Sequence, residues 1–64
     1  MEKWKNFRVD IFNAGKHQKE YFDTERAARD YVMECKIMKL MPDTAQYFLL
    51  RHIIDGKYDV VGEL

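Results

Sequence analysis

The sequence predicts an α+β fold of the order ββαββ, a four-stranded antiparallel sheet (order 2-1-3-4) with one helix packed on one face. Four segments have the alternation or aliphatic content of strands, and one segment between the second and third has apolar residues at helical spacing. An Asp-Gly pair marks a tight hairpin between the last two. The 64 residues leave room for one domain, expected over residues 1–64.

The first two expected strands form a hairpin around residues 13–15. In residues 4–12 every second residue from Phe7 to Ile11 is apolar, which is typical of a half-buried strand. We expect a type I turn whose last residue, a glycine, adopts positive φ in a G1 bulge. The returning segment 17–22 is mostly polar, as suits an edge strand.

The helix is expected over residues 25–39. Asp23 and Thr24 are both suitable N-cap residues, and the sequence does not distinguish them. Pro42 must end the helix at or before Met41. The apolar residues on the predicted buried face are Ala28, Tyr31, Val32 and Cys35. On the opposite side lie Met33, Ile37, Leu40 and Met41, which either form an adaptable contact strip or fold back onto the core.

The second hairpin joins strands expected at residues 44–54 and 58–64 through a type I′ turn at Asp55-Gly56. The third strand carries large apolar residues on both faces. A right-handed crossover through the helix makes the second and third strands parallel, with the first strand between them. The two most hydrophobic strands then become central and the two charged strands become edges.

One helix covers one face of such a sheet, so the other face must be polar or covered by another molecule. Counting through the second turn places Leu50 opposite Val61 and His52 opposite Asp59. The reverse assignment of the third strand, which exchanges Arg51 and His52 between core and surface, remains open. The residues expected under the helix are Phe7, Val9, Ile11, Phe48, Leu50, Ile54 and Val61.

The face without a helix is the predicted functional surface. It is rich in Trp, Tyr and Arg, the residues that dominate the binding energy of protein interfaces. We therefore expect a small protein-interaction or regulatory module that binds a partner protein or a second copy of itself as a homodimer. The alternative is that these aromatic rings lie flat under Lys and Arg stems. The predicted partner-binding residues are Trp4, Arg8, Phe12, Tyr47, Leu49, Arg51, Ile53 and Tyr58.

Zero net charge conceals an asymmetry along the chain. Residues 1–19 carry five positive and two negative charges, whereas residues 20–35 carry two positive and five negative charges. A basic first hairpin beside aromatic residues could follow a phosphate backbone, so a small nucleic-acid-binding protein is the second hypothesis. The cations that it would use are Lys3, Lys5, Arg8, Lys16 and Lys19, with Arg51 from the third strand.

The sequence offers little for catalysis. It contains no serine, and its single thiol, Cys35, falls on the buried face of the helix. His17, His52 and this cysteine have no metal-ligand spacing, and a pair of His52 with Asp59 is more typical of structure than of a general base. We expect no enzyme, no catalytic residue, no cofactor and no bound metal.

The expected cellular setting follows from two absences in the sequence. No apolar run approaches the roughly 18 residues of a membrane span, and the chain begins with no signal-peptide pattern. One cysteine is compatible with a reducing compartment. We expect a cytoplasmic protein without membrane contact. Small chains of this kind are often encoded by phages or mobile elements, and an inhibitor of one host protein is one form of the hypothesis.

Overall fold

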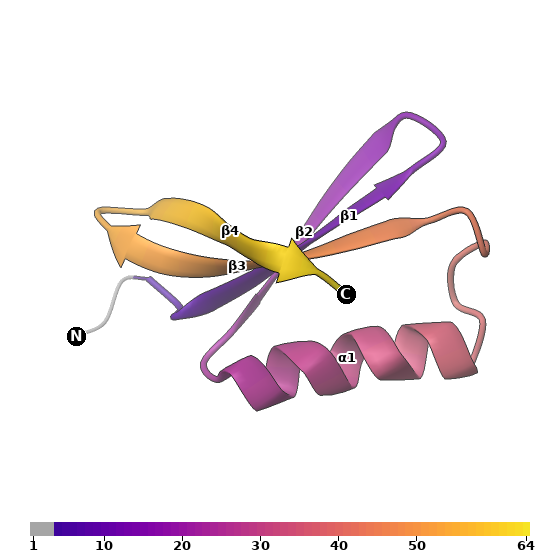
Figure 1. Ribbon diagram of the computed structural model, residues 1–64, viewed down its shortest axis with the longest axis horizontal. Helices are drawn as coiled ribbons and strands as arrows, with labels where there is room; N and C mark the ends of the chain where they lie inside the picture. Colours follow the sequence, from indigo (N-terminus) through magenta and orange to yellow (C-terminus); the bar gives the residue numbers. More distant parts are fainter. Residues whose placement is uncertain (1–3) are drawn as a thin grey trace.

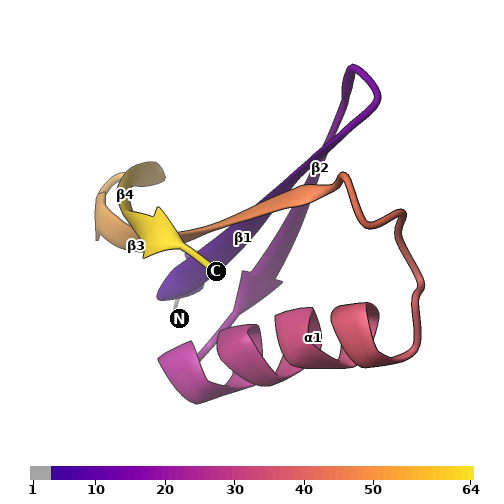
Figure 2. The same ribbon diagram turned by 45° about the vertical axis from the view of Figure 1, so that its right-hand side comes forward.

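The computed structural model describes residues 4–64 and confirms the predicted order of elements. The elements are β1 (Phe7–Asn13), β2 (Lys16–Phe22), α1 (Glu25–Ile37), β3 (Gln46–Ile54) and β4 (Lys57–Glu63). The sheet has the predicted order β2-β1-β3-β4, and all neighbouring strands are antiparallel. The helix lies along one side of the twisted sheet, and within residues 4–64 no other element lies on the opposite side (Figure 1, Figure 2).

Both hairpins close with two residues of positive φ, which is the type I′ geometry that matches strand twist. At Asp55-Gly56 the φ angles are 48° and 80°, so the predicted type I′ turn is confirmed. At Ala14-Gly15 they are 51° and 81°, so the predicted type I turn with a G1 bulge is wrong. β1 and β2 stay in register up to this turn because no extra residue interrupts the ladder.

The two ends of α1 are capped by different means. Thr24 is the N-cap, and its Oγ1 accepts a hydrogen bond from the Ala27 N–H at 3.1 Å. At the other end Lys39 has a φ of 53°, and the Leu40 N–H bonds to the carbonyl oxygen of Cys35 at 3.0 Å. This is the Schellman arrangement, with a lysine where glycine is usual. The helix therefore ends two residues before the predicted position.

The core lies between α1 and the three strands that it contacts, β1, β2 and β3. The odd-numbered residues of β1 face the helix, as predicted. Cys35 is buried on the helix face predicted for it. The fully enclosed part of the core is made of Val9, Ile11, Ala28, Val32, Cys35, Tyr47 and Leu49. Met41 folds back onto this cluster, whereas Met33, Ile37 and Leu40 remain exposed.

The face predicted for β3 is wrong. Leu49 lies opposite Val9 and Tyr47 lies opposite Ile11. Side chains of directly opposed residues share a face, so the odd-numbered residues of β3 point to the helix. The residues predicted there, Phe48, Leu50 and Ile54, are not part of the cluster under the helix.

The pairing predicted between β3 and β4 is also displaced by one residue. The register shifts at Leu49/Leu50 and again between His52 and Ile54, because a bulge adds an unpaired residue to one strand. As a result Leu50 lies opposite Val60, and His52 lies opposite Tyr58. The prediction that Val61 belongs to the core is wrong, since this side chain is exposed. Within residues 4–64 no helix has the length and apolarity needed to cross a bilayer.

Candidate functional site

The open face is the sheet face opposite α1, and its side chains come from all four strands. Strand pairing assigns a residue to this face when its direct partner is already there. The open face consists of Arg8, Asp10 and Phe12 from β1, His17, Lys19 and Tyr21 from β2, Gln46, Phe48, Leu50 and His52 from β3, and Tyr58, Val60 and Glu63 from β4. Trp4 joins it by stacking on His52.

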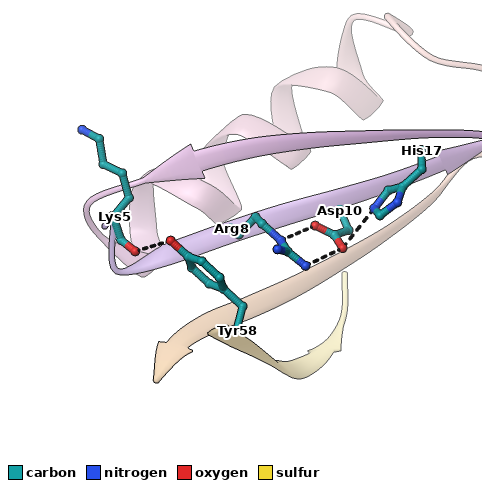
Figure 3. Close-up of polar contacts among 5 residues, drawn as sticks. All are labelled: Lys5, Arg8, Asp10, His17 and Tyr58. Carbon is teal, nitrogen blue, oxygen red and sulfur yellow. Dashed lines mark hydrogen bonds and ion pairs between the residues drawn. The ribbon is translucent and has the colours of Figure 1, made fainter. Parts of the chain in front are cut away.

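An ion pair occupies the centre of the open face. The Arg8 Nε lies 2.7 Å from Asp10 Oδ1, and the Arg8 Nη2 lies 3.0 Å from Asp10 Oδ2. His17 Nε2 approaches the same Oδ2 at 3.1 Å, as Figure 3 shows. The Asp10 and Arg8 side chains are only 8% and 16% exposed. This bidentate geometry is the strongest form of the guanidinium–carboxylate contact, and it balances both charges locally.

Tyr58 covers this ion pair. Its ring lies 4.9 Å from the Arg8 guanidinium carbon, and its hydroxyl donates a hydrogen bond to the Lys5 carbonyl oxygen at 2.7 Å (Figure 3). The edge of the Tyr21 ring meets it with centroids 5.8 Å apart. Burial raises the pKa of Tyr58, and the neighbouring Tyr21 raises it further against the opposing effect of Arg8. The hydroxyl therefore stays protonated and remains a donor at neutral pH.

The first aromatic cluster lies near the second hairpin turn. The Trp4 indole stacks on His52 with centroids 6.1 Å apart, and His52 also meets Tyr58 at 5.2 Å. His52 Nε2 accepts a hydrogen bond from the Gly56 N–H at 3.1 Å, so the imidazole is fixed to the turn. A Cβ atom at Gly56 would lie 2.8 Å from the indole, which means that the turn and Trp4 pack directly together.

The second aromatic cluster lies near the first hairpin. Phe12 stacks on His17 with centroids 4.2 Å apart and meets Phe48 edge to face at 5.7 Å. His17 is therefore held by the Phe12 ring and by Asp10 at once. The two clusters and the central ion pair form one continuous layer of side chains in contact with one another.

The structure brings together four of the eight predicted partner-binding residues, namely Trp4, Arg8, Phe12 and Tyr58. It does not place Tyr47, Leu49 or Arg51 with them. The first two are buried under α1, and the third lies opposite Phe7 on the helix side. Their predicted placement on the open face is wrong because the odd-numbered side chains of β3 face the helix.

The remaining predicted residues lie at the second turn. Ile53 is exposed where the β3–β4 register shifts, away from the central ion pair. The predicted pair of His52 with Asp59 is wrong, because the imidazole bonds to the turn and Asp59 lies opposite Arg51.

The sequence analysis placed Arg8 on this face but missed its ion pair with Asp10, although one signal was present. Arg8 and Asp10 are two residues apart in a strand, which places both side chains on one face. The contribution of His17 follows only from the type I′ turn, which sets it opposite Phe12. Tyr21 was missed for the same reason, since its partner across β1 is Arg8.

The basic set predicted for nucleic acid is only partly available. Lys3 lies outside the described residues. Lys5 pairs with Asp23 at 3.2 Å, and the Arg8 charge is balanced by Asp10. Lys16 and Lys19 are exposed on the edge strand β2, and Lys19 lies opposite Asp10 on the open face, whereas Arg51 lies on the helix side. Among residues 4–64 the predicted cations therefore do not form one row on the open face, as contact with a phosphate backbone would require.

A cleft lies at the margin of this face. Its volume is about 310 Å³, and it is lined by Trp4, Lys5, Tyr21 and Tyr58. Cys35, the single thiol of the sequence, lies in the core on the other side of the sheet. Among residues 4–64 no group of three or more His, Cys, Asp or Glu side chains is placed to hold a metal ion.

Comparisons with models of protein families, with curated proteins and with solved structures find no match to this chain.

Proposed function

We propose that the chain is a non-enzymatic protein-interaction module that binds a partner protein through the open face. One observation carries the proposal: three rings at the margin of this face stay substantially exposed while resting on other aromatic side chains. Trp4, Phe12 and Tyr21 are 43%, 40% and 47% exposed. Exposed Trp and Tyr beside a buried Arg is the composition of interface hot spots.

The rings are fixed before any partner arrives. Each exposed ring has a stacking or edge partner on the same face, which is His52 for Trp4, His17 for Phe12 and Tyr58 for Tyr21. Side chains that are already ordered lose little conformational entropy on binding, so more of the contact energy is available as affinity. This supports a specific contact rather than nonspecific hydrophobic association.

The chemistry of the face also suggests the chemistry of the partner. The central charges cancel within the Arg8–Asp10 pair, so neither an acidic nor a basic partner gains much at the centre. The cleft beside it is lined mainly by aromatic carbon from Trp4, Tyr21 and Tyr58. We therefore favour an apolar or aromatic segment of another protein.

A different protein fits the open face better than a second copy does. The predicted homodimer contact consists of Trp4, Tyr47, Leu49 and Ile53, and two of these residues, Tyr47 and Leu49, are buried under α1. We place the module in the cytoplasm. Because the chain is small, we favour a regulatory role. One example is a phage-encoded or mobile-element-encoded chain that inhibits one host protein.

The test compares two double variants, one on the open face and one on the exposed side of α1. Trp4→Ala/Phe12→Ala removes exposed rings from the open face, and Met33→Ala/Ile37→Ala removes exposed apolar side chains from α1. In affinity capture from cells of the source organism, we expect a partner recovered by the wild type to be lost by the first variant only. Equal retention by both variants, or loss by the helix variant alone, would reject the open face as the site.

Binding to oligonucleotides is the outcome that would replace this proposal. Titration with short single strands and duplexes at low and physiological salt separates the two functions, because phosphate contacts weaken steeply as salt rises. We expect no binding at physiological salt. Salt-sensitive binding that is lost in Lys16→Glu/Lys19→Glu would support nucleic acid instead.

A further inference from the structure

The two histidines of the open face hold their neighbours through opposite kinds of contact. His52 Nε2 accepts a hydrogen bond from the Gly56 N–H at 3.1 Å, so this nitrogen carries a lone pair and no proton. His17 Nε2 lies 3.1 Å from Asp10 Oδ2, so a proton on this nitrogen faces a carboxylate oxygen. Protonation therefore strengthens the contact of His17 and removes the contact of His52. Histidine changes its charge between about pH 5 and about pH 8, so both contacts respond in this range.

The surroundings of His52 offer little to replace the lost bond. The charged residues near it on the surrounding segments are Lys5 before β1, Arg8 of β1, Arg51 of β3, Asp55 and Lys57 at the turn, and Asp59 of β4. Within residues 4–64 no carboxylate lies within ion-pair distance of the imidazole. Asp59 lies opposite Arg51 on the helix side of the sheet.

The aromatic neighbour on β4 is also occupied. The Tyr58 ring meets the imidazole with centroids 5.2 Å apart, but the Arg8 guanidinium already lies 4.9 Å from the centre of that ring. A protonated His52 therefore has a second cation beside it on the same ring. It also points an N–H group at the N–H group of Gly56, where the neutral imidazole accepts a hydrogen bond.

The bond between Gly56 and His52 helps to hold Trp4 in place. The indole stacks on His52, and the turn packs against it so closely that a Cβ atom at Gly56 would lie 2.8 Å from the ring. Trp4 precedes β1, which begins at Phe7, so strand pairing does not fix its side chain. The ring is held between the imidazole and the turn, and it loses this position when the two separate.

We propose that His52 is a pH-sensitive switch whose protonation releases the second hairpin turn and Trp4 from each other, while His17 and Asp10 keep the Phe12 end of the open face ordered. The consequence for a partner rests on the proposed function: binding weakens in acid, because Trp4 is no longer ordered beforehand. The release itself takes place in the single chain. Its test needs no partner, and its failure would leave the proposed function standing.

The two hairpin turns provide a matched pair for the test. Both have positive φ at two residues and end in glycine, but a Cβ atom at Gly15 would meet nothing within 4 Å, whereas Gly56 faces the indole. NMR spectra of the full chain at about pH 7.5 and about pH 5.5 compare the two glycines. Both pH values lie above the ordinary titration range of carboxylates and on either side of that of histidine.

Two signals should change at Gly56 and not at Gly15. At the higher pH the ring current of Trp4 shifts a Gly56 α-hydrogen upfield, and this shift should shrink at the lower pH. The Gly56 N–H should exchange with water about five-fold more slowly, relative to Gly15, at the higher pH than at the lower one. The ratio removes the general dependence of amide exchange on pH, which acts on both turns alike.

Two variants assign the change to one imidazole. His52→Gln supplies a side-chain oxygen that accepts the Gly56 hydrogen bond and does not titrate, so both signals should be the same at the two pH values. His17→Gln should keep the wild-type change at Gly56. Far-UV circular dichroism should show that each variant is folded.

A wild-type protein in which neither Gly56 signal changes relative to Gly15 would overturn the proposal, and this measurement needs no variant. The proposal would also fail if the change persisted in folded His52→Gln or disappeared in folded His17→Gln. In either case a group other than His52 would control the turn.

Discussion

The two faces of the sheet bury side chains by different means. Leu49 and Leu50 are neighbours in β3 and are 0% and 5% exposed, yet only Leu49 lies under α1. Leu50 lies on the open face between Arg8 and Val60, where no helix of residues 4–64 lies over it. A layer of long polar and aromatic side chains thus buries Leu50 at the centre of the open face almost as completely as α1 buries Leu49. It leaves its marginal rings exposed.

The largest expected effect sharpens this comparison. Leu49→Ala should lower the free energy of unfolding by about 3 kcal/mol, because the helix holds the cavity open. Leu50→Ala should lower it by about 2 kcal/mol, since side chains without a helix above them relax into the space. Urea unfolding followed by circular dichroism measures both. Equal losses would mean that the two faces pack with equal rigidity.

The ion pair gives the next largest effect and belongs to the open face alone. Asp10→Ala leaves the Arg8 guanidinium without its carboxylate in a mostly enclosed position, and we expect a loss of about 2–3 kcal/mol. The replacement Arg8→Met/Asp10→Leu removes both charges together and should recover most of that loss. The same urea experiment measures both variants.

A double variant as unstable as Asp10→Ala would argue against this account of the ion pair. The loss would then come from the geometry of the layer and not from an unpaired charge. Arg8→Met alone provides the control, because it leaves the Asp10 carboxylate with His17 as a remaining partner.

The sequence predicted the covered face of β1 and failed for β3, for a physical reason. Phe7, Val9 and Ile11 alternate with polar residues, so the strand has one possible buried face. In β3 every residue from 47 to 50 is apolar, and alternation carries no information there. Arg51 lies on the helix side, opposite Phe7, and is exposed there, so its charge did not identify the open face.

The sequence predicts the positions of the site residues only where the alternation of apolar and polar residues within one strand determines which face they occupy. The placement of Arg8 and Phe12 on one face follows from strand alternation. Tyr58 was placed there by two errors that cancel, because the predicted face of β3 and the predicted β3–β4 pairing are each displaced by one residue. The contacts of His17 and His52 depend on turn type and on bulges, each of which shifts pairing by a whole residue. Such shifts depend on the backbone conformation of a few residues, which composition does not reveal.

Tyrosine ionisation gives a smaller effect that depends on pH. Burial raises the pKa of Tyr31 to about 12, and its hydrogen bond to the Cys35 thiol raises it too. Burial also raises the pKa of Tyr47 on the covered face, as it does for Tyr58 on the open face. Above pH 10 the unfolded chain loses these protons first. Stability is therefore complete below the unfolded pKa and is lost as pH rises through the folded values.

Tyr31→Phe should make this alkaline loss shallower, because one of the raised groups is removed. Urea unfolding at about pH 9 and about pH 11.5 measures the difference in each protein. Tyr58→Phe gives the matched measurement on the open face, at the cost of the hydrogen bond to Lys5. If both variants follow the wild-type dependence on pH, neither tyrosine is protected from ionisation by the fold.

The smallest expected effect concerns the helix that covers one face, and it shows whether the two faces form together. Lys39 has positive φ at the end of α1, so Lys39→Gly should stabilise the protein by about 0.5–1 kcal/mol. Glu34→Gly, inside the helix, should destabilise it by a similar amount. The single tryptophan, Trp4, reports the open face by fluorescence, and circular dichroism reports the helix.

Both signals should shift together in both variants, because the two faces share the strands β1 and β3 and should unfold as one unit. A shift in circular dichroism without a shift in fluorescence would separate the faces. The open face would then be an ordered layer that does not need the helix, and its side-chain network alone would hold the sheet in register.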